Sequence, residues 1–273
     1  MSVFRQNQRL KLLSYNLQVG IDSHGYRDYV TQSWRHLLPD SKRAHNLRQA
    51  ADWLSSYDIV ALQEVDGGSL RSQFINQVAF LASEGGFPHF HQQQNRRVAG
   101  LAAHSNGLLS KFASSHAIHH KLPGRIPGRG ALEVTFGSGD HQVLVLSVHL
   151  SLSHSARKPQ LEYIAELVKD IPYFIIMGDM NCPTYKVSEE FKRLGVKVKQ
   201  GKKGTPTFPR WNPKHCFDQI WVSDSLNIIK SEVLHLGVSD HLPVAMEIEF
   251  PFDPEQLNQD SVKSTSIPKS FLN

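Results

Sequence analysis

The residues best suited to chemistry stand where apolar stretches end. In Tyr-Phe-Ile-Ile-Met-Gly-Asp-Met-Asn (173–181), five apolar or aromatic residues precede Gly178 and the polar pair Asp179 and Asn181. The apolar run predicts a buried strand, and side-chain alternation then places both polar residues on one face. A carboxylate orients a water molecule or a metal ion, and an amide donates a hydrogen bond to an oxyanion. A D-x-N turn that only closes a strand has the same letters, so other segments must decide.

The same arrangement recurs along the chain. Five further apolar segments, each predicted to be a strand, have a polar residue at one end or in the adjoining turn. One such residue means little, but six such positions are hard to explain by coincidence. Carboxylates and an amide bind a hard divalent cation such as Mg²⁺, and a carboxylate beside a histidine fixes its tautomer. The pattern indicates metal-assisted attack of water on phosphorus. The positions are Asn16 in 10–16, Glu64 in 58–64, His149 in 142–149, Asp218 in 217–223, and Asp240 with His241 before 243–250.

Other periodic segments predict the elements that position these residues. Apolar residues at helical spacing predict helices over 41–56, 69–84 and 155–169, the first of them covering a sheet. Segments 98–112 and 131–136 read as strands around the loop KLPGRIPGRG. The glycines and prolines of that loop favour an ordered connection rather than a linker.

The composition describes a globular chain with a modest basic excess. The 273 residues include 30 Lys and Arg against 25 Asp and Glu, which gives a net charge of +5. The excess mildly favours a polyanionic or phosphate-bearing partner, although a solvated basic surface is the simpler explanation. Since no low-complexity linker interrupts the chain, we expect one domain over residues 1–250, followed by a loosely packed polar tail at 251–273.

Cysteine use and hydropathy bear on the compartment. Cys182 and Cys216 are the only cysteines, which excludes the disulfide framework of small secreted domains. No segment reaches the length of a signal peptide's apolar core or of a transmembrane span. We therefore expect a cytoplasmic monomer without a transmembrane segment. Cys182 is predicted to be a buried free thiol rather than a catalytic one.

Six short motifs closely resemble the endonuclease/exonuclease/phosphatase superfamily. They are SYNLQ, DIVALQEVD, SVHLSLS, IIMGDMNCPT, FDQIWVS and SDHLPVAMEI, all in the order of that family. The family includes DNase I-like nucleases, exonuclease III-like repair enzymes, inositol polyphosphate 5-phosphatases and neutral sphingomyelinases. The resemblance implies an α/β fold, namely a four-layer α/β sandwich of two mixed β-sheets with helices outside, and an active site at one edge.

The resemblance also implies a role for each motif residue. Glu64 corresponds to the principal Mg²⁺ ligand, with Asn16 and Asp240 close by. Asp179 corresponds to the residue that orients and activates water, and Asn181 to the one that hydrogen-bonds the phosphate.

A second group corresponds to the family's histidines and substrate contacts. Asp218 is expected to hold His241, which contacts the phosphate or transfers a proton, and His149 is expected near the leaving oxygen. Arg129 lies where related nucleases place a cation near phosphate, although a surface arginine explains it equally. Asn106 is a candidate for the cleft, although an Asn-Gly turn explains it at least as well.

Three histidines suggest a second metal site. His116, His119 and His120 lie close together in the sequence. A polar loop before KLPGR is the better explanation.

The leading hypothesis is a Mg²⁺-dependent phosphoesterase, foremost a phosphodiesterase acting on nucleic acid, with Mn²⁺ able to substitute. The alternatives are a phospholipid phosphodiesterase resembling sphingomyelinases, a phosphoinositide phosphatase, and a catalytically silent phosphate-binding module. The complete set of motif residues disfavours the silent module. A nuclease should show a basic groove, and a lipid enzyme should show exposed apolar loops near the site. Phe208 and Trp211 suit a base, a membrane surface or packing at the sheet rim.

Overall fold

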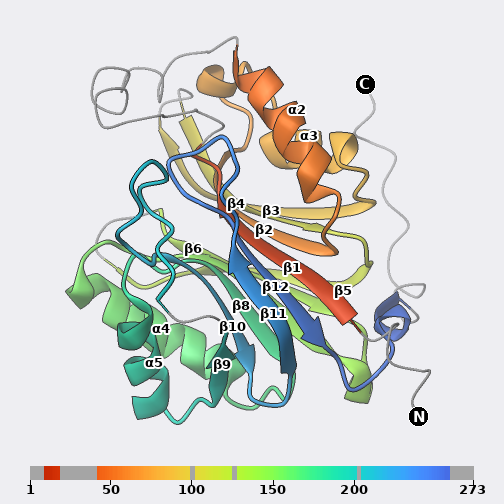
Figure 1. Ribbon diagram of the computed structural model, residues 1–273, viewed down its shortest axis with the longest axis vertical. Helices are drawn as coiled ribbons and strands as arrows, with labels where there is room; N and C mark the ends of the chain where they lie inside the picture. Colours follow the sequence, from red (N-terminus) through yellow and green to blue (C-terminus); the bar gives the residue numbers. More distant parts are fainter. Residues whose placement is uncertain (1–8, 19–41, 99–101, 125–127, 202–203, 259–273) are drawn as a thin grey trace.

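Two six-stranded sheets pack face to face in the computed structural model, which describes residues 9–18, 42–98, 102–124, 128–201 and 204–258 (Figure 1). The first sheet has the strand order β11-β12-β1-β2-β4-β3, and the second has the order β5-β6-β7-β8-β10-β9. The strands of the first sheet are β1 (Arg9–Asn16), β2 (Ile59–Asp66), β3 (His89–Val98), β4 (Ala102–Ser110), β11 (Asn227–Val233) and β12 (Val244–Glu249). Those of the second are β5 (Ser114–Lys121), β6 (Gly130–Phe136), β7 (Val143–His149), β8 (Phe174–Asp179), β9 (Val198–Gln200) and β10 (Asp218–Ser223).

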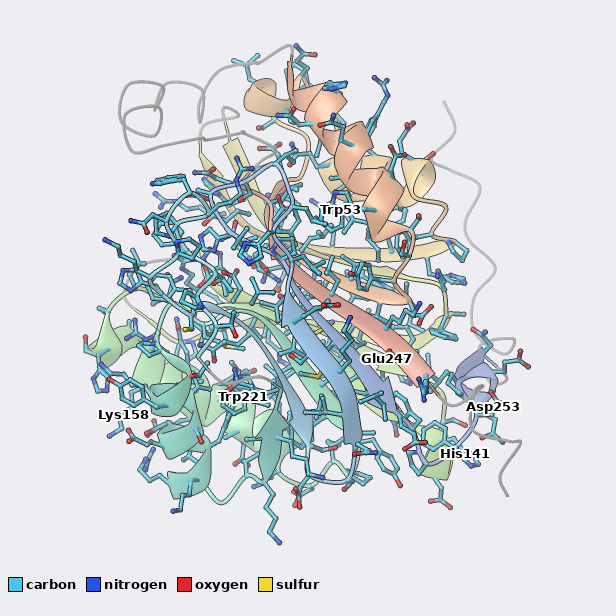
Figure 2. All side chains as sticks on the ribbon, in the orientation of Figure 1. Trp53, His141, Lys158, Trp221, Glu247 and Asp253 are labelled. Atoms are coloured by element: carbon cyan, nitrogen blue, oxygen red, sulfur yellow. The ribbon has the colours of Figure 1, made fainter. Side chains whose placement is uncertain are left out.

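Helices cover the outer face of each sheet, which gives four layers. The helices α2 (Lys42–Leu54) and α3 (Gln77–Glu84) lie on the first sheet, and α4 (His154–Val168) and α5 (Thr184–Arg193) lie on the second (Figure 1). Figure 2 labels one tryptophan at each helix–sheet contact: Trp53 of α2 packs against Tyr15 of β1, and Trp221 of β10 packs against Phe191 of α5. The predicted four-layer sandwich is therefore confirmed. No described helix is long and apolar enough to span a bilayer.

Both faces of the central strands are buried, which explains their continuous apolar sequences. In β1, Leu12 enters the core between the sheets, and its neighbour Leu13 enters the core beneath α2 and α3. In β8, Ile175 and Ile176 divide in the same way between the inner core and the layer beneath α4 and α5. Such double burial produces apolar runs instead of a period-two alternation.

Two parallel strand pairs carry the polar residues to one edge. β1 and β2 are parallel, with Asn16 opposite Gln63, and β7 and β8 are parallel, with His149 opposite Asp179. β10 runs antiparallel to β8 and places Asp218 opposite Asp179. The carboxyl ends of four strands and the start of a fifth therefore meet at the same edge of the sandwich.

The predicted helix over 69–84 is wrong in its first half. A short 3₁₀ helix η4 (Leu70–Ser72) is followed by Gln73 and Phe74 with left-handed backbone, at φ 55° and 62°, which ends the helical path. The side chain of Asn76 then accepts hydrogen bonds from two backbone amides and caps α3. Apolar spacing alone did not reveal this new start.

The elements that the sequence did not predict are mostly polar or lie at edges. They are β3, β5, β9, β11 and α5, none of which shows a long apolar run. His116, His119 and His120 lie in β5, so the predicted polar loop is wrong, although these histidines form no close metal-ligand group in the described chain. Edge strands escape prediction because one side has no neighbouring strand and their faces are partly solvated.

The polar tail begins later than predicted. Phe252 and Leu257 are buried in the core between the sheets, and η6 (Pro254–Asn258) follows the last strand. Asp253, labelled in Figure 2, belongs to this segment, and the ring of His141, also labelled, packs edge-on against Phe252 at a centroid distance of 5.1 Å. Residues up to 258 therefore belong to the packed domain, and the tail from 259 lies outside the described residues.

Gly178 provides a test of how tightly the two parallel strands pack at the edge. It has φ 153°, and a Cβ at this position would collide with the backbone oxygen of Val148. We expect Gly178→Ala to lower the free energy of unfolding by about 4 kcal/mol or more, measured by urea denaturation. The control Gly86→Ala shares a positive φ of 69° but meets no heavy atom within 4 Å, so it should cost only about 1 to 2 kcal/mol. Equal losses in the two variants would contradict the close packing.

Candidate active site

All eight predicted core residues converge at the edge where the parallel strands end. They are Asn16, Glu64, His149, Asp179, Asn181, Asp218, Asp240 and His241, and seven of them are at most 9% exposed. Glu64 is the exception, with a side chain that is 34% exposed. The cluster is therefore mostly buried and opens to solvent beside Glu64.

A distortion in β2 turns Glu64 into the site. The pairing of β2 with β4 shifts register between Leu62 and Val65, and Glu64 has a left-handed backbone with φ 55°. Such bulges redirect a side chain that regular alternation would send elsewhere. The positive φ is unfavourable for a residue with a Cβ, so the fold holds Glu64 in a strained backbone conformation.

Asn16 links two carboxylates. Its Nδ2 donates to Glu64 Oε1 at 3.3 Å and to Asp179 Oδ2 at 3.2 Å. Gln18 extends the network, since its Nε2 donates to Asp240 Oδ2 at 3.0 Å. Gln18 was not predicted as a site residue because it follows the predicted strand, although it is the last residue of the SYNLQ motif.

Asp179 and Asn181 form a rigid turn after β8. The Asn181 backbone has φ 50°, its amide donates to Asp179 Oδ1 at 2.8 Å, and its side-chain Nδ2 donates to Leu150 O at 2.9 Å. The side-chain amide nitrogen carries two hydrogens, so one remains for a ligand. The D-x-N segment therefore forms a turn that closes the strand and still leaves its side chains available to a ligand.

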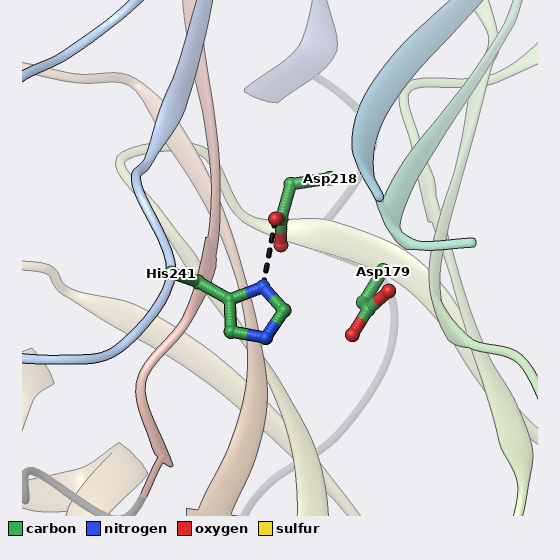
Figure 3. A group of neighbouring side chains, drawn as sticks. All are labelled: Asp179, Asp218 and His241. Atoms are coloured by element: carbon green, nitrogen blue, oxygen red, sulfur yellow. Dashed lines mark hydrogen bonds and ion pairs between the residues drawn. The ribbon is translucent and has the colours of Figure 1, made fainter. Parts of the chain in front are cut away.

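His241 is held by Asp218, as expected. Its Nδ1 lies 2.8 Å from Asp218 Oδ2, and Figure 3 shows this contact, with the Asp179 carboxylate beside the imidazole ring. Phe208 packs against the ring at a centroid distance of 4.7 Å and against Phe217 at 5.7 Å. Phe208 therefore packs against the histidine, as in the predicted alternative that it packs at the sheet rim. Trp211 is half-buried.

Burial and mutual repulsion shift the pKa values of the site carboxylates. Burial, followed by the charge of Asp218, raises the pKa of Asp179 to about 7. Burial also raises the pKa of Asp240 to about 6, although His241 opposes the rise. For Glu64, burial raises the pKa, but His149, His241 and the Asn16 hydrogen bond outweigh it and leave the pKa below its usual value.

The pKa values of the two site histidines are shifted in opposite directions. Burial and then the nearby charge of Arg129 lower the pKa of His149 to about 3, so its imidazole is neutral. Burial also disfavours the charged form of His241, but the charge and hydrogen bond of Asp218 override it and raise the pKa to about 10. His241 is therefore a cation at neutral pH, and His149 is not.

Arg129 and Asn106 both line a pocket of about 210 Å³ beside the cluster. Glu64 and His149 form its inner wall. The Nδ2 of Asn106 donates to Gly130 O at 3.0 Å, and its buried Oδ1 has no protein partner. Both residues thus occupy the cleft rather than a distant turn or an open surface. The remaining lining residues are Asn95, Arg96, His104, Ser105 and Gly128.

One group of potential metal ligands lies in the core of the site. Asp179, Asp218 and His241 each place one ligand atom within 4.8 Å of the others (Figure 3). Glu64 lies on the other side of Asp179, where both carboxylates accept from the same Asn16 nitrogen. Asp179 therefore stands between two places that oxygen-seeking cations favour.

The fold and the buried carboxylate–histidine cluster define a phosphoesterase of the DNase I-like class. The sequence profile of the Endonuclease/Exonuclease/phosphatase family matches residues 13–241, so the chain belongs to this family. Its members hydrolyse phosphoester bonds. None of the curated proteins matches the chain in sequence.

Solved structures of low identity share the fold. A family protein from Beutenbergia cavernae has a TM-score of 0.69 at 17% identity, covering 92% of this chain and 76% of its own. One from Leptotrichia buccalis has a TM-score of 0.67 at 16% identity, covering 88% and 100%. A mannosyl-6-phosphatase from Bacteroides thetaiotaomicron has a TM-score of 0.63 at 17% identity, again covering 88% and 100%.

The His241–Asp218 contact predicts a specific titration. In the metal-free protein, His241 should remain protonated through neutral pH and titrate near the value of about 10 that Asp218 imposes. Asp218→Asn should lower that pKa by about two or more, because it removes the opposing charge. Histidine NMR signals followed against pH measure the change, and the exposed Asp224→Asn serves as the control.

The same shift has a consequence for stability. Because the folded pKa of His241 lies above the ordinary 6.5, its contribution is complete below pH 6.5 and is lost as pH rises toward 10. The stability difference between wild type and Asp218→Asn should therefore shrink over that range in urea denaturation. A difference that stays constant from pH 6 to about pH 10 would contradict the charged pair.

Proposed function

We propose that this protein is a divalent-cation-dependent phosphodiesterase that attacks phosphorus with water. The observation that carries the proposal is the position of Asp179. Its carboxylate lies between the Asn16 amide and the imidazole of His149, with Nδ2 at 3.2 Å and Nε2 at 3.5 Å, and it faces the His241–Asp218 pair. A base, a cationic acid and neutral hydrogen-bond donors thus surround one small space.

The residues fit a hard cation on the Glu64 side of Asp179. Glu64 raises the pKa of both Asp179 and Asp240 through repulsion, and a divalent ion would relieve that repulsion. Carboxylate and amide oxygens, without thiolates, favour Mg²⁺ or Mn²⁺. When bound, such an ion would neutralise charge on the phosphate oxygens.

The alternative set of Asp179, Asp218 and His241 fits a cation less well. His241 Nδ1 and Asp218 Oδ2 already partner each other at 2.8 Å. A protonated imidazole has no free lone pair to offer a metal. We therefore assign the cation to Glu64, with Asn16 and Asp240 in support, and leave His241 as a proton-bearing group.

The protein's own side chains transfer protons and bind the phosphate oxygens. Asp179, with a pKa near neutrality, accepts a proton from the attacking water. His241, as a cation, donates a hydrogen bond to a phosphate oxygen and can supply a proton to the leaving alcohol. Asn181, Arg129 and the neutral His149 donate hydrogen bonds to the other oxygens of the phosphate. The products are a phosphate monoester and an alcohol.

The nuclease hypothesis and its alternatives differ in the class of substrate that is hydrolysed. The net charge of +5 and Arg129 in the cleft support an anionic polymer, and counterion release would then make affinity salt-dependent. A mannosyl-6-phosphatase among the similar structures supports monoesters as a further candidate. Product analysis with plasmid DNA, RNA, phospholipid and phosphomonoesters, each with Mg²⁺ and with EDTA, separates these classes.

Metal removal should abolish turnover. Hydrolysis of bis(p-nitrophenyl) phosphate should cease in excess EDTA and return with Mg²⁺ or Mn²⁺. Glu64→Gln should raise the Mg²⁺ concentration for half-maximal activity by about tenfold or more, because it removes a charged ligand. The matched control is Glu189→Gln on the exposed face of α5. Full activity in EDTA, or a strict need for Zn²⁺, would refute the assignment.

Asp218 should act through His241. His241→Ala and Asp218→Asn should each lower turnover by roughly 10²- to 10⁴-fold, as expected for lost acid-base help. Because the two side chains form one unit, the double variant should be about as slow as His241→Ala alone. A double defect equal to the product of the single defects would show that the residues act independently.

A further inference from the structure

The rim of the site carries an unusual share of exposed apolar side chains. In the described part of the chain, eight large hydrophobic residues are exposed, and five of them lie in segments that follow or precede the site strands. The two most exposed are Phe74 at 73% and Leu152 at 74%. The five are Leu70, Phe74, Leu152, Tyr185 and Leu236, here called the apolar rim.

Three rim residues lie within six positions of a site residue, and Leu70 and Phe74 lie in the connection that follows β2. Leu152 lies three residues beyond His149, and Leu236 lies in the same connection as Asp240. Tyr185 is the second residue of α5, which begins five residues after Asp179. The rim residues therefore lie in or next to the connections that join the site strands to the next elements.

The loop that carries Leu152 is fixed from beneath. The buried guanidinium of Arg157 donates to the carbonyl oxygens of Ser151 and Leu152. Gln160 accepts from the Ser151 amide at 2.9 Å and donates to Ser151 Oγ at 3.0 Å. Since buried polar groups hold its backbone on both sides, Leu152 is presented to solvent by a defined structure.

The loop that carries Phe74 is fixed in the same manner. The fully buried carboxylate of Asp66 accepts five hydrogen bonds from residues of this loop and from Ala103, with distances of 2.8 to 3.2 Å. Phe74 itself has a left-handed backbone, which is unfavourable for a bulky residue. An aromatic side chain held outward at the expense of backbone strain favours a binding role.

A second cavity, which includes Leu152, shares Arg129 with the catalytic pocket. It has a volume of about 890 Å³, and Leu152, Ala156 and Pro159 line it together with Gly124, Arg129, Ser151, Ser153 and Ser155. Arg129 also lines the catalytic pocket with Glu64. A ligand with a phosphate beside Arg129 could therefore extend an apolar portion along α4.

Two exposed cations lie beside Tyr185 and in the catalytic pocket. Lys186 lies over the ring of Tyr185 at 6.0 Å, and both side chains are exposed. Arg96 is exposed at the mouth of the catalytic pocket. Apolar and aromatic side chains with cations beside them are suited to the headgroup region of an anionic bilayer.

We propose that the apolar rim docks on a phospholipid bilayer and that the site hydrolyses a phosphodiester presented there, with Phe74 and Leu152 as the anchoring side chains. This inference rests on the proposed phosphodiesterase activity for its catalytic half only. It names a substrate class different from the nucleic acid that net charge favoured. Isolated exposed apolar residues are normal, but five of them in or next to the connections beside the site strands mark a candidate interaction surface.

Flotation with vesicles tests the docking without relying on catalysis. Wild type should float with vesicles of equimolar phosphatidylcholine and phosphatidylglycerol, and Phe74→Ser with Leu152→Ser should weaken partitioning by roughly tenfold per side chain. The matched control, Phe90→Ser with Ile229→Ser, removes two apolar residues that are 43% and 40% exposed on β3 and β11. It should float as wild type does, and thermal melting checks that both variants fold.

Activity on two substrates separates this inference from the proposed function. On vesicles the rim variant should lose at least about tenfold more turnover than on bis(p-nitrophenyl) phosphate. Asp179→Asn should lose turnover on both substrates and still float. If wild type hydrolyses neither the vesicle phosphodiester nor bis(p-nitrophenyl) phosphate, the proposed function is refuted. Flotation then still decides whether the rim docks on the bilayer. Docking is overturned if wild type does not float, if the rim variant floats equally well, or if the rim variant loses binding to duplex DNA instead.

Discussion

Repulsion between buried carboxylates is the constraint on which the rest of the site depends. Asp179, Asp218 and Asp240 are each at most 4% exposed, and Glu64 faces them from β2. Buried like charges cannot all remain ionised without compensation. One cationic histidine, the Asn16 amide and Arg129 supply part of it, and the proposed divalent cation supplies the rest. The site is therefore arranged to favour additional positive charge and an anionic phosphate that accompanies it.

The sandwich explains how such an unfavourable group can persist. Each carboxylate stands in or beside a strand that packs into the apolar cores, so a large apolar core offsets the local repulsion. The unusual backbones occur where the site needs them. Glu64, Asn181 and Gly178 all have positive φ and lie at or beside the carboxylates. These conformations orient side chains that regular strands would have directed elsewhere.

The sequence predicted the core strands and the eight site positions because apolar runs ending in polar residues are local signals. It did not reveal the bulge at Glu64, which depends on register with β4. It also did not reveal the hydrogen bonds of Gln18 to Asn16 and to Asp240, because Asp240 is far from Gln18 in the sequence. Edge strands such as β5 also escaped, since their histidines show no apolar pattern. The role of Phe208 depended on packing against His241, and only tertiary structure decides among alternatives of this kind.

Anomalous diffraction from crystals grown with Mn²⁺ tests the central claim most directly, because it locates the cation among the carboxylates. The account predicts one strong peak at about 2.2 Å from a Glu64 carboxylate oxygen, on the side of Asp179 away from the His241 ring. A peak between Asp218 and His241, or manganese bound only to exposed acidic side chains, would contradict it.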